Sequence, residues 1–136
     1  MPFAPHALVS TQKGPRMKFD FQRFARIAAT AYPEGCHYTL EQCLEVFRYY
    51  FQTYEDFMGR PHPPIRREQI TRIMGEMPCI VMEDRGENIE LLDLEEYRSM
   101  IDLHFLTQYR KCDYNINHFF SGRVRELRFY EMECGY

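Results

Sequence analysis

The chain has 136 residues, 45% of them hydrophobic, a length and composition that fit one domain with a substantial core. Its net charge of -3, from 17 basic and 20 acidic residues, argues against both a strongly basic nucleic-acid binder and an acidic DNA mimic. The five cysteines form no C-x-x-C pair, the N-terminus lacks an apolar signal segment, and no stretch approaches about 18 apolar residues. We therefore expect a cytoplasmic protein with reduced thiols and no membrane partner.

The first sixteen residues hold three prolines and no periodic pattern, which predicts a flexible N-terminal tail. Residues 17–132 are expected to form a single helical domain. Its first helix is predicted to begin near Phe19 or Asp20 and to end before Pro33, because proline cannot continue a helix.

The second predicted helix carries the clearest end signals in the chain. Thr39 and Gln42 form a capping-box pattern at its start, and Gly59 ends it. Aromatic residues lie on more than one of its faces, which is typical of a helix at the centre of a domain. Tyr50 and Tyr54 are also candidates for protein binding. The sequence leaves open whether these two side chains lie in the core or at an interface.

The third helix is predicted over residues 65–77, before Pro78. Short apolar runs then flank a turn centred on Gly86, which favours a small β-hairpin near residues 79–92, with an irregular loop as the alternative. Asp93 is predicted to cap a fourth helix, and the face that this helix buries is predicted to extend to Gln108.

A fifth element is expected from Tyr114 to Glu131, with Gly122 as a candidate break. The predicted fold class is therefore mainly α, with four to five helices and one small β-hairpin.

Metal-binding and nucleophilic patterns are weak. No two cysteines lie closer than seven positions apart, whereas structural zinc sites favour close ligand pairs, so we predict no metal. The candidates tested for a metal were Cys36, His37, Cys43, Cys79, His104, Cys112, His118 and Cys134. An enzyme would need a pocket that gathers His104, His118 and a cysteine, and no motif in the chain predicts one. No catalytic residue and no cofactor is therefore assigned.

Nucleic-acid binding is favoured by arginines near two predicted helix starts, where phosphates can also meet backbone N–H groups. The candidate phosphate contacts are Arg66, Arg67, Arg72, Arg123, Arg125 and Arg128. The alternative is that these arginines pair with acidic residues of the same chain.

Protein binding is favoured by the chain's many aromatic, Met and Arg residues, which are enriched at interfaces. Besides Tyr50 and Tyr54, an acidic segment provides the candidates Glu87, Glu90, Glu95 and Glu96. DNA, RNA, a protein partner and a second copy of the chain all remain open.

The stretch from Tyr38 to Tyr130, with the distinctive piece NINHFFSG at residues 115–122, resembles small uncharacterised helical proteins of Gram-positive mobile elements. The order of a basic helix, an acid-led helix (LDLEEYRSMIDLHF) and an aromatic closing segment is similar to the C-terminal helical module of phage replisome organisers. The hairpin between these helices departs from that module.

These resemblances imply a non-enzymatic accessory protein of a mobile element that binds a macromolecule. Proteins in that setting also include inhibitors of host nucleases such as anti-CRISPR proteins, which gives the alternative of a protein-binding inhibitor or adaptor.

Overall fold

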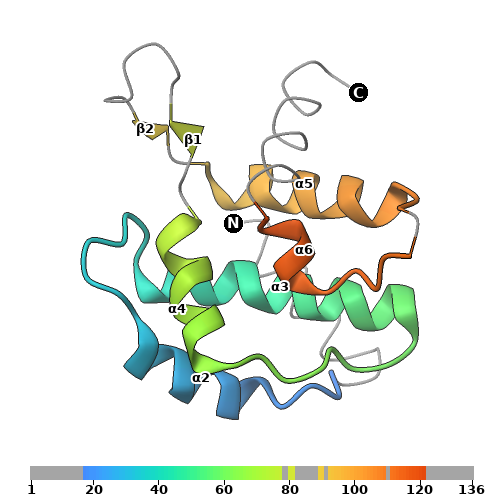
Figure 1. Cartoon of the computed structure of the whole chain (residues 1–136), viewed down its shortest axis with the longest axis horizontal. Helices are drawn as coiled ribbons and strands as arrows, with labels where there is room; N and C mark the ends of the chain where they lie inside the picture. Colours follow the sequence, from blue (N-terminus) through green and yellow to red (C-terminus); the bar gives the residue numbers. More distant parts are fainter. Residues whose placement is uncertain (1–16, 78–79, 82–88, 91, 110, 122–136) are drawn as a thin grey trace.

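The computed structural model describes residues 17–77, 80–81, 89–90, 92–109 and 111–121 (Figure 1). Within these residues the fold is mainly helical, as predicted. The elements are α2 (Phe21–Ala31), α3 (Leu40–Met58), α4 (Arg67–Glu76), β1 (Ile80–Val81), β2 (Ile89–Glu90), α5 (Leu94–Leu106) and α6 (Ile116–Phe119). None of these helices is both long enough and apolar enough to cross a membrane.

The segment predicted as a hairpin is described only in part. β1 and β2 pair antiparallel over two residues each, with Ile80 opposite Glu90 and Val81 opposite Ile89. The turn around Gly86 lies outside the described residues, so the hairpin as a whole stays a prediction. The predicted tail, 1–16, and the chain from Gly122 onward also lie outside them.

Local capping fixes the two longest helices where the sequence predicts them. The Thr39 hydroxyl accepts the N–H of Gln42 at 3.1 Å, and the Gln42 side chain accepts the N–H of Thr39 at 2.9 Å. Asp93 and Glu96 form the same reciprocal pair at the start of α5. At its other end α3 stops at Gly59, whose φ of 76° lies in the left-handed region that glycine tolerates.

Two helix ends differ from the sequence pattern. The α4 helix begins at Arg67 rather than at Ile65, since Arg66 is extended and occupies the N-cap. The α5 helix ends at Leu106, because Thr107 turns to an extended conformation. Gln108, which periodicity placed on the buried stripe of this helix, is therefore exposed outside it.

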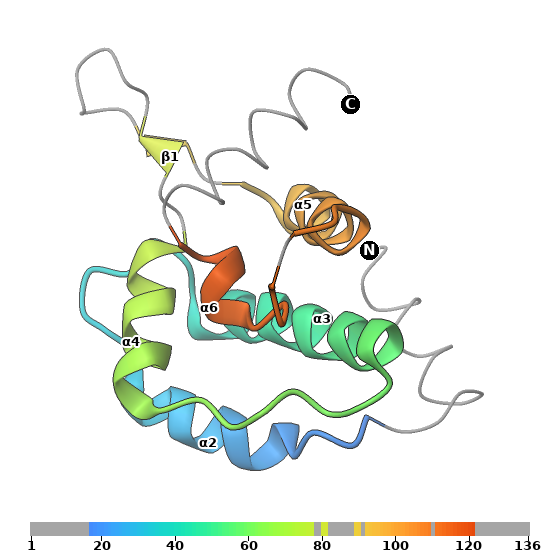
Figure 2. The ribbon, with the colours of Figure 1, turned by 45° about the vertical axis from the view of Figure 1, so that its right-hand side comes forward.

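The α3 helix lies at the centre of the described fold, with α2 on one side and α5 on the other (Figures 1 and 2). The α5 helix packs against α3 and crosses it at an angle, because Figure 2 shows α5 almost end-on while α3 lies across the view; α4 packs against α2. On the α2 side, the ring of Phe24 lies 4.8 Å from that of Phe47. On the opposite side, the ring of Tyr50 lies 5.1 Å from Phe105 of α5 and 5.6 Å from Phe119 of α6.

This arrangement corrects the assignment of Tyr50 and Tyr54 to a protein-binding surface. Their exposed fractions are 0% and 2%, because α5 and the segment around α6 cover that side of α3. The hydroxyl of Tyr50 is satisfied internally and donates to the carbonyl of Tyr114 at 2.6 Å. Both tyrosines are therefore core residues.

Candidate functional site

Charge divides between the helices of the fold. The central α3 and its neighbour α5 carry seven acidic and two basic residues. The opposite layer consists of the segment 17–31 with α2 and the segment 60–76 with α4, and we call it the basic face. Its acidic residues are Asp20, Glu68 and Glu76, and its seven basic residues are Lys18, Arg23, Arg26, Arg60, Arg66, Arg67 and Arg72.

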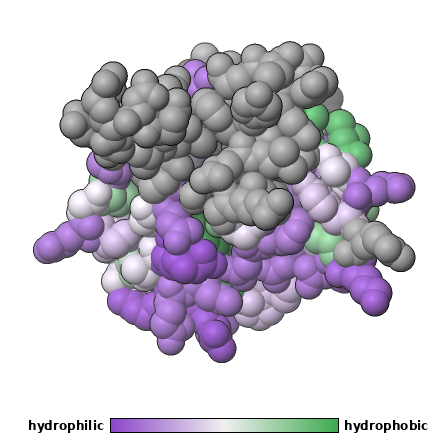
Figure 3. Space-filling model, turned by 45° about the horizontal axis from the view of Figure 1, so that its top comes forward, coloured by the Kyte–Doolittle hydropathy of each residue, from purple (hydrophilic) through white to green (hydrophobic). Residues whose placement is uncertain are grey.

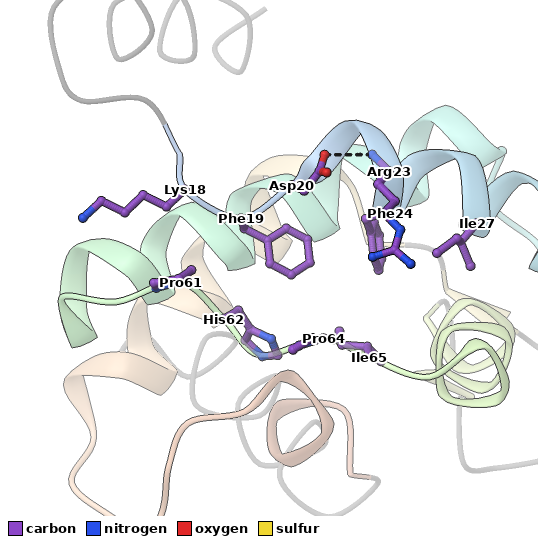
Figure 4. A pocket seen from close by; sticks show the side chains of 10 residues that line it. All are labelled: Lys18, Phe19, Asp20, Arg23, Phe24, Ile27, Pro61, His62, Pro64 and Ile65. Carbon is purple, nitrogen blue, oxygen red and sulfur yellow. Dashed lines mark hydrogen bonds between the residues drawn. The ribbon is translucent and has the colours of Figure 1, made fainter.

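A groove of about 210 Å³ opens on this basic face, between the start of α2 and the proline-rich loop (Figure 4). Phe24 and Ile27 of α2 line one wall, while the other wall is lined by the loop residues Pro61, His62, Pro64 and Ile65. Arg23 reaches over the groove from α2, and Lys18 extends away from it at one end (Figure 4). The groove therefore combines an apolar lining with two cations and the carboxylate of Asp20.

The segment that leads into α2 is fixed by contacts with α3. The Glu55 carboxylate accepts the N–H groups of Lys18 and Phe19 at 3.0 and 2.7 Å. The ring of Phe19 stacks on Phe51, with the ring centroids 4.2 Å apart. Asp20 then caps α2 by accepting the N–H of Arg23 at 3.1 Å. Phe19 is thus held at the groove while remaining partly exposed.

His62 forms the buried back of the groove and is 3% exposed. Its Nε2 accepts the N–H of Ile116 at 3.0 Å, and its Nδ1 lies 2.8 Å from the carbonyl oxygen of Pro63. These two contacts require a neutral ring that carries its proton on Nδ1. Burial lowers the pKa of His62 from 6.5 to about 4. His62 therefore ties the groove loop to α6 as a neutral residue.

Of the six arginines proposed as phosphate contacts, three lie within the described residues. Arg67 donates to the hydroxyl and the carbonyl of Thr30, at the end of α2. Arg72 bridges Glu76 at 3.2 Å and Asn117 of α6 at 2.9 Å. Arg66 is exposed, with Glu68 at 4.0 Å. Arg67 and Arg72 thus join helices. Arg66 and Arg72 have acidic neighbours, as the alternative of internal pairing expects, whereas Arg67 binds an uncharged threonine. Outside the described residues lie Arg123, Arg125 and Arg128.

The acidic candidates also have structural contacts. Glu95 pairs with Arg98 at 3.3 Å, and Glu96 belongs to the capping box of α5. Glu87 lies outside the described residues, and Glu90 is described only as a backbone position in β2. The acidic surface stays a prediction.

The candidates tested for a metal fall into two separate groups. Cys36 and Cys43 have their sulfurs 4.0 Å apart beside α4. His104, Cys112 and His118 come together between α5 and α6, although no sequence motif links them. Within the described ranges, no set of three or more His, Cys, Asp or Glu residues has the arrangement of a metal site.

Sequence analysis missed the groove itself. Its lining joins residues that are more than 40 positions apart, such as Phe19 and Ile65, so no local pattern marks it. The one available signal was the basic balance of the first 35 residues, which includes Lys18, Arg23 and Arg26.

Comparison with protein-family models gives no match, and no significant match is found among curated proteins or solved structures.

Proposed function

We propose that this protein is a non-enzymatic accessory factor that binds nucleic acid through its basic face. The observation that carries the proposal is the separation of charge. The basic face has seven basic and three acidic residues, whereas α3 and α5 together have two basic and seven acidic residues. Phosphate contacts need clustered cations rather than a positive total charge, so a net charge of -3 is compatible with such a surface.

Arg23, Arg26 and Arg66 are the proposed phosphate contacts within the described residues. All three are exposed; Arg23 lines the groove, Arg26 belongs to α2, and Arg66 is the N-cap residue of α4. Arg67 and Arg72 are proposed to position the helices that present them, since both already bind within the chain.

The groove suits an unpaired base. Proteins that bind single strands combine a cationic path for the backbone with aromatic side chains that stack on bases. The partly exposed ring of Phe19, beside Arg23, provides this combination. We therefore propose single-stranded DNA or RNA as the preferred ligand.

The test is a salt titration of binding to labelled single- and double-stranded DNA and RNA, followed by fluorescence anisotropy. Changing Arg23, Arg26 and Arg66 to Gln should lower the slope of log affinity against log salt by about 2 for single strands. The control changes Arg98 and Lys111, which lie outside the basic face, to Gln, and the slope change per charge removed is compared between the two variants. Absence of binding at low salt, or an equal effect in the control, would refute the proposal.

A second candidate, a protein-binding adaptor or inhibitor, is favoured by exposed apolar side chains. Phe57 is 51% exposed and Leu106 is 79% exposed, near the ends of α3 and α5. Hydrophobic surface is visible at that end of the molecule, on the right in Figure 3. If a second copy binds there, sedimentation equilibrium should show a dimer that Leu106→Glu dissociates. A monomer at all concentrations would leave only a different protein as the partner.

A further inference from the structure

Away from the basic face, the loop between α5 and α6 places a thiol against two imidazoles. The sulfur of Cys112 lies 3.5 Å from Nδ1 of His118. The same nitrogen lies 3.5 Å from Nε2 of His104. Cys112 and His118 are half-buried, whereas His104 is fully buried. Cys112 is therefore partly open to solvent, whereas the second imidazole is enclosed in the core.

The backbone of this loop is strained on both sides of the thiol. Lys111 and Tyr114 have φ values of 54° and 57°, in the left-handed region that costs a non-glycine residue about 1 kcal/mol or more. Such a conformation persists only where its surroundings impose it. The Tyr114 hydroxyl donates to the carbonyl of Thr107 at 2.6 Å, and the Tyr114 carbonyl accepts from Tyr50 at 2.6 Å.

The strained turn supplies the sulfur with a hydrogen-bond donor. The N–H of Tyr114 points to Cys112 Sγ at 3.2 Å. A backbone N–H directed at sulfur stabilises the thiolate over the thiol, and a neighbouring imidazole can take the thiol proton. The ring of Tyr109, 4.8 Å from that of His118, packs against this imidazole and helps to hold it in place.

We propose that Cys112 is a nucleophilic thiol that undergoes exchange with small-molecule disulfides, with His118 as its base. Nothing in the nucleic-acid proposal depends on this site.

The exchange is balanced without any further oxidant. The Cys112 thiol transfers its proton to His118 Nδ1, and the resulting thiolate attacks one sulfur of the disulfide. The disulfide bond breaks as the new bond to Cys112 forms. The departing thiolate takes the proton from His118, so the products are a mixed disulfide on Cys112 and one free small thiol.

Cys36 provides a matched comparison within the same protein. It is also half-buried, but its thiol donates to the carbonyl oxygen of Met74 at 3.2 Å. A carbonyl acceptor favours the protonated thiol, so Cys36 has similar access to solvent and the opposite electrostatic environment.

The experiment treats the full-length folded protein with a limiting amount of 4,4′-dithiodipyridine, quenches with acid and maps the modified peptides by mass spectrometry. Cys112 should react at least about tenfold faster than Cys36, within the range that a positioned acid or base contributes. His118→Asn should slow Cys112 by about tenfold, whereas the exposed control His37→Asn should not.

Equal rates for Cys112 and Cys36 in the unmodified protein would overturn the proposal, and this comparison needs no variant to fold. An unchanged Cys112 rate in a folded His118→Asn protein, checked by circular dichroism, would overturn the role of His118.

Discussion

Acidification should destabilise this protein through His62. Burial lowers its pKa to about 4, against 6.5 for the ordinary side chain. Between these two values the unfolded chain binds a proton at this residue and the folded chain does not, so stability falls as the pH falls. The difference of about 2.5 in pKa, at about 1.4 kcal/mol for each pH unit, corresponds to about 3.5 kcal/mol in full, of which about 3 kcal/mol is lost by pH 4. That loss should develop between about pH 7 and pH 4.

Two measurements test this reasoning. The ¹H NMR shift of the His62 ring in the native protein should titrate with a midpoint near 4, and a midpoint near 6.5 would refute the argument. Urea unfolding at several pH values should show that the stability difference between the natural chain and His62→Asn shrinks by about 3 kcal/mol from pH 7 to pH 4. In a His37→Asn control, the acid-dependent loss should persist, because that residue is exposed.

Four further outcomes follow from the described contacts. Thr39→Ala should cost about 1 kcal/mol in urea unfolding, because it removes the hydroxyl that caps α3; no change would mean that the cap contributes nothing. Gly59→Ala should destabilise by about 1 kcal/mol because of its positive φ. In contrast, Gly75→Ala should stabilise α4 by about 0.5 to 1 kcal/mol, since the added Cβ meets only Pro33 at 3.9 Å. If both glycine substitutions changed the free energy of unfolding in the same direction, this reasoning would be contradicted. Burial raises the pKa of the Cys43 thiol, so iodoacetamide should label it more slowly than Cys36 or Cys112, and fast labelling would show that the core opens.

The parts of the fold that sequence predicts well depend on neighbouring residues. The capping pairs Thr39–Gln42 and Asp93–Glu96 lie three positions apart, so the chain itself shows where α3 and α5 begin. The central place of α3 was also predictable, because apolar residues lie on more than one face of this helix.

The candidate sites depend on contacts that only the folded chain creates. Arg67 resembled a phosphate contact because it stands near a helix start, yet its partner Thr30 lies 37 residues away. Cys112 meets His104 and His118 through a turn with two residues of positive φ, and nothing in their spacing indicates it. Sequence analysis named the two histidines with a cysteine as the set that an enzyme would gather, but it could not predict that Cys112 is the cysteine that joins them.

The central position of α3 has a consequence for how the chain tolerates truncation. Phe47 and Phe51 of this helix pack against α2, while Tyr50 and Tyr54 pack toward α5, so both layers share one helix. A fragment that lacked either layer would expose large aromatic rings on the remaining one. The two layers should therefore not survive as separate fragments, and the described fold should unfold as one cooperative unit.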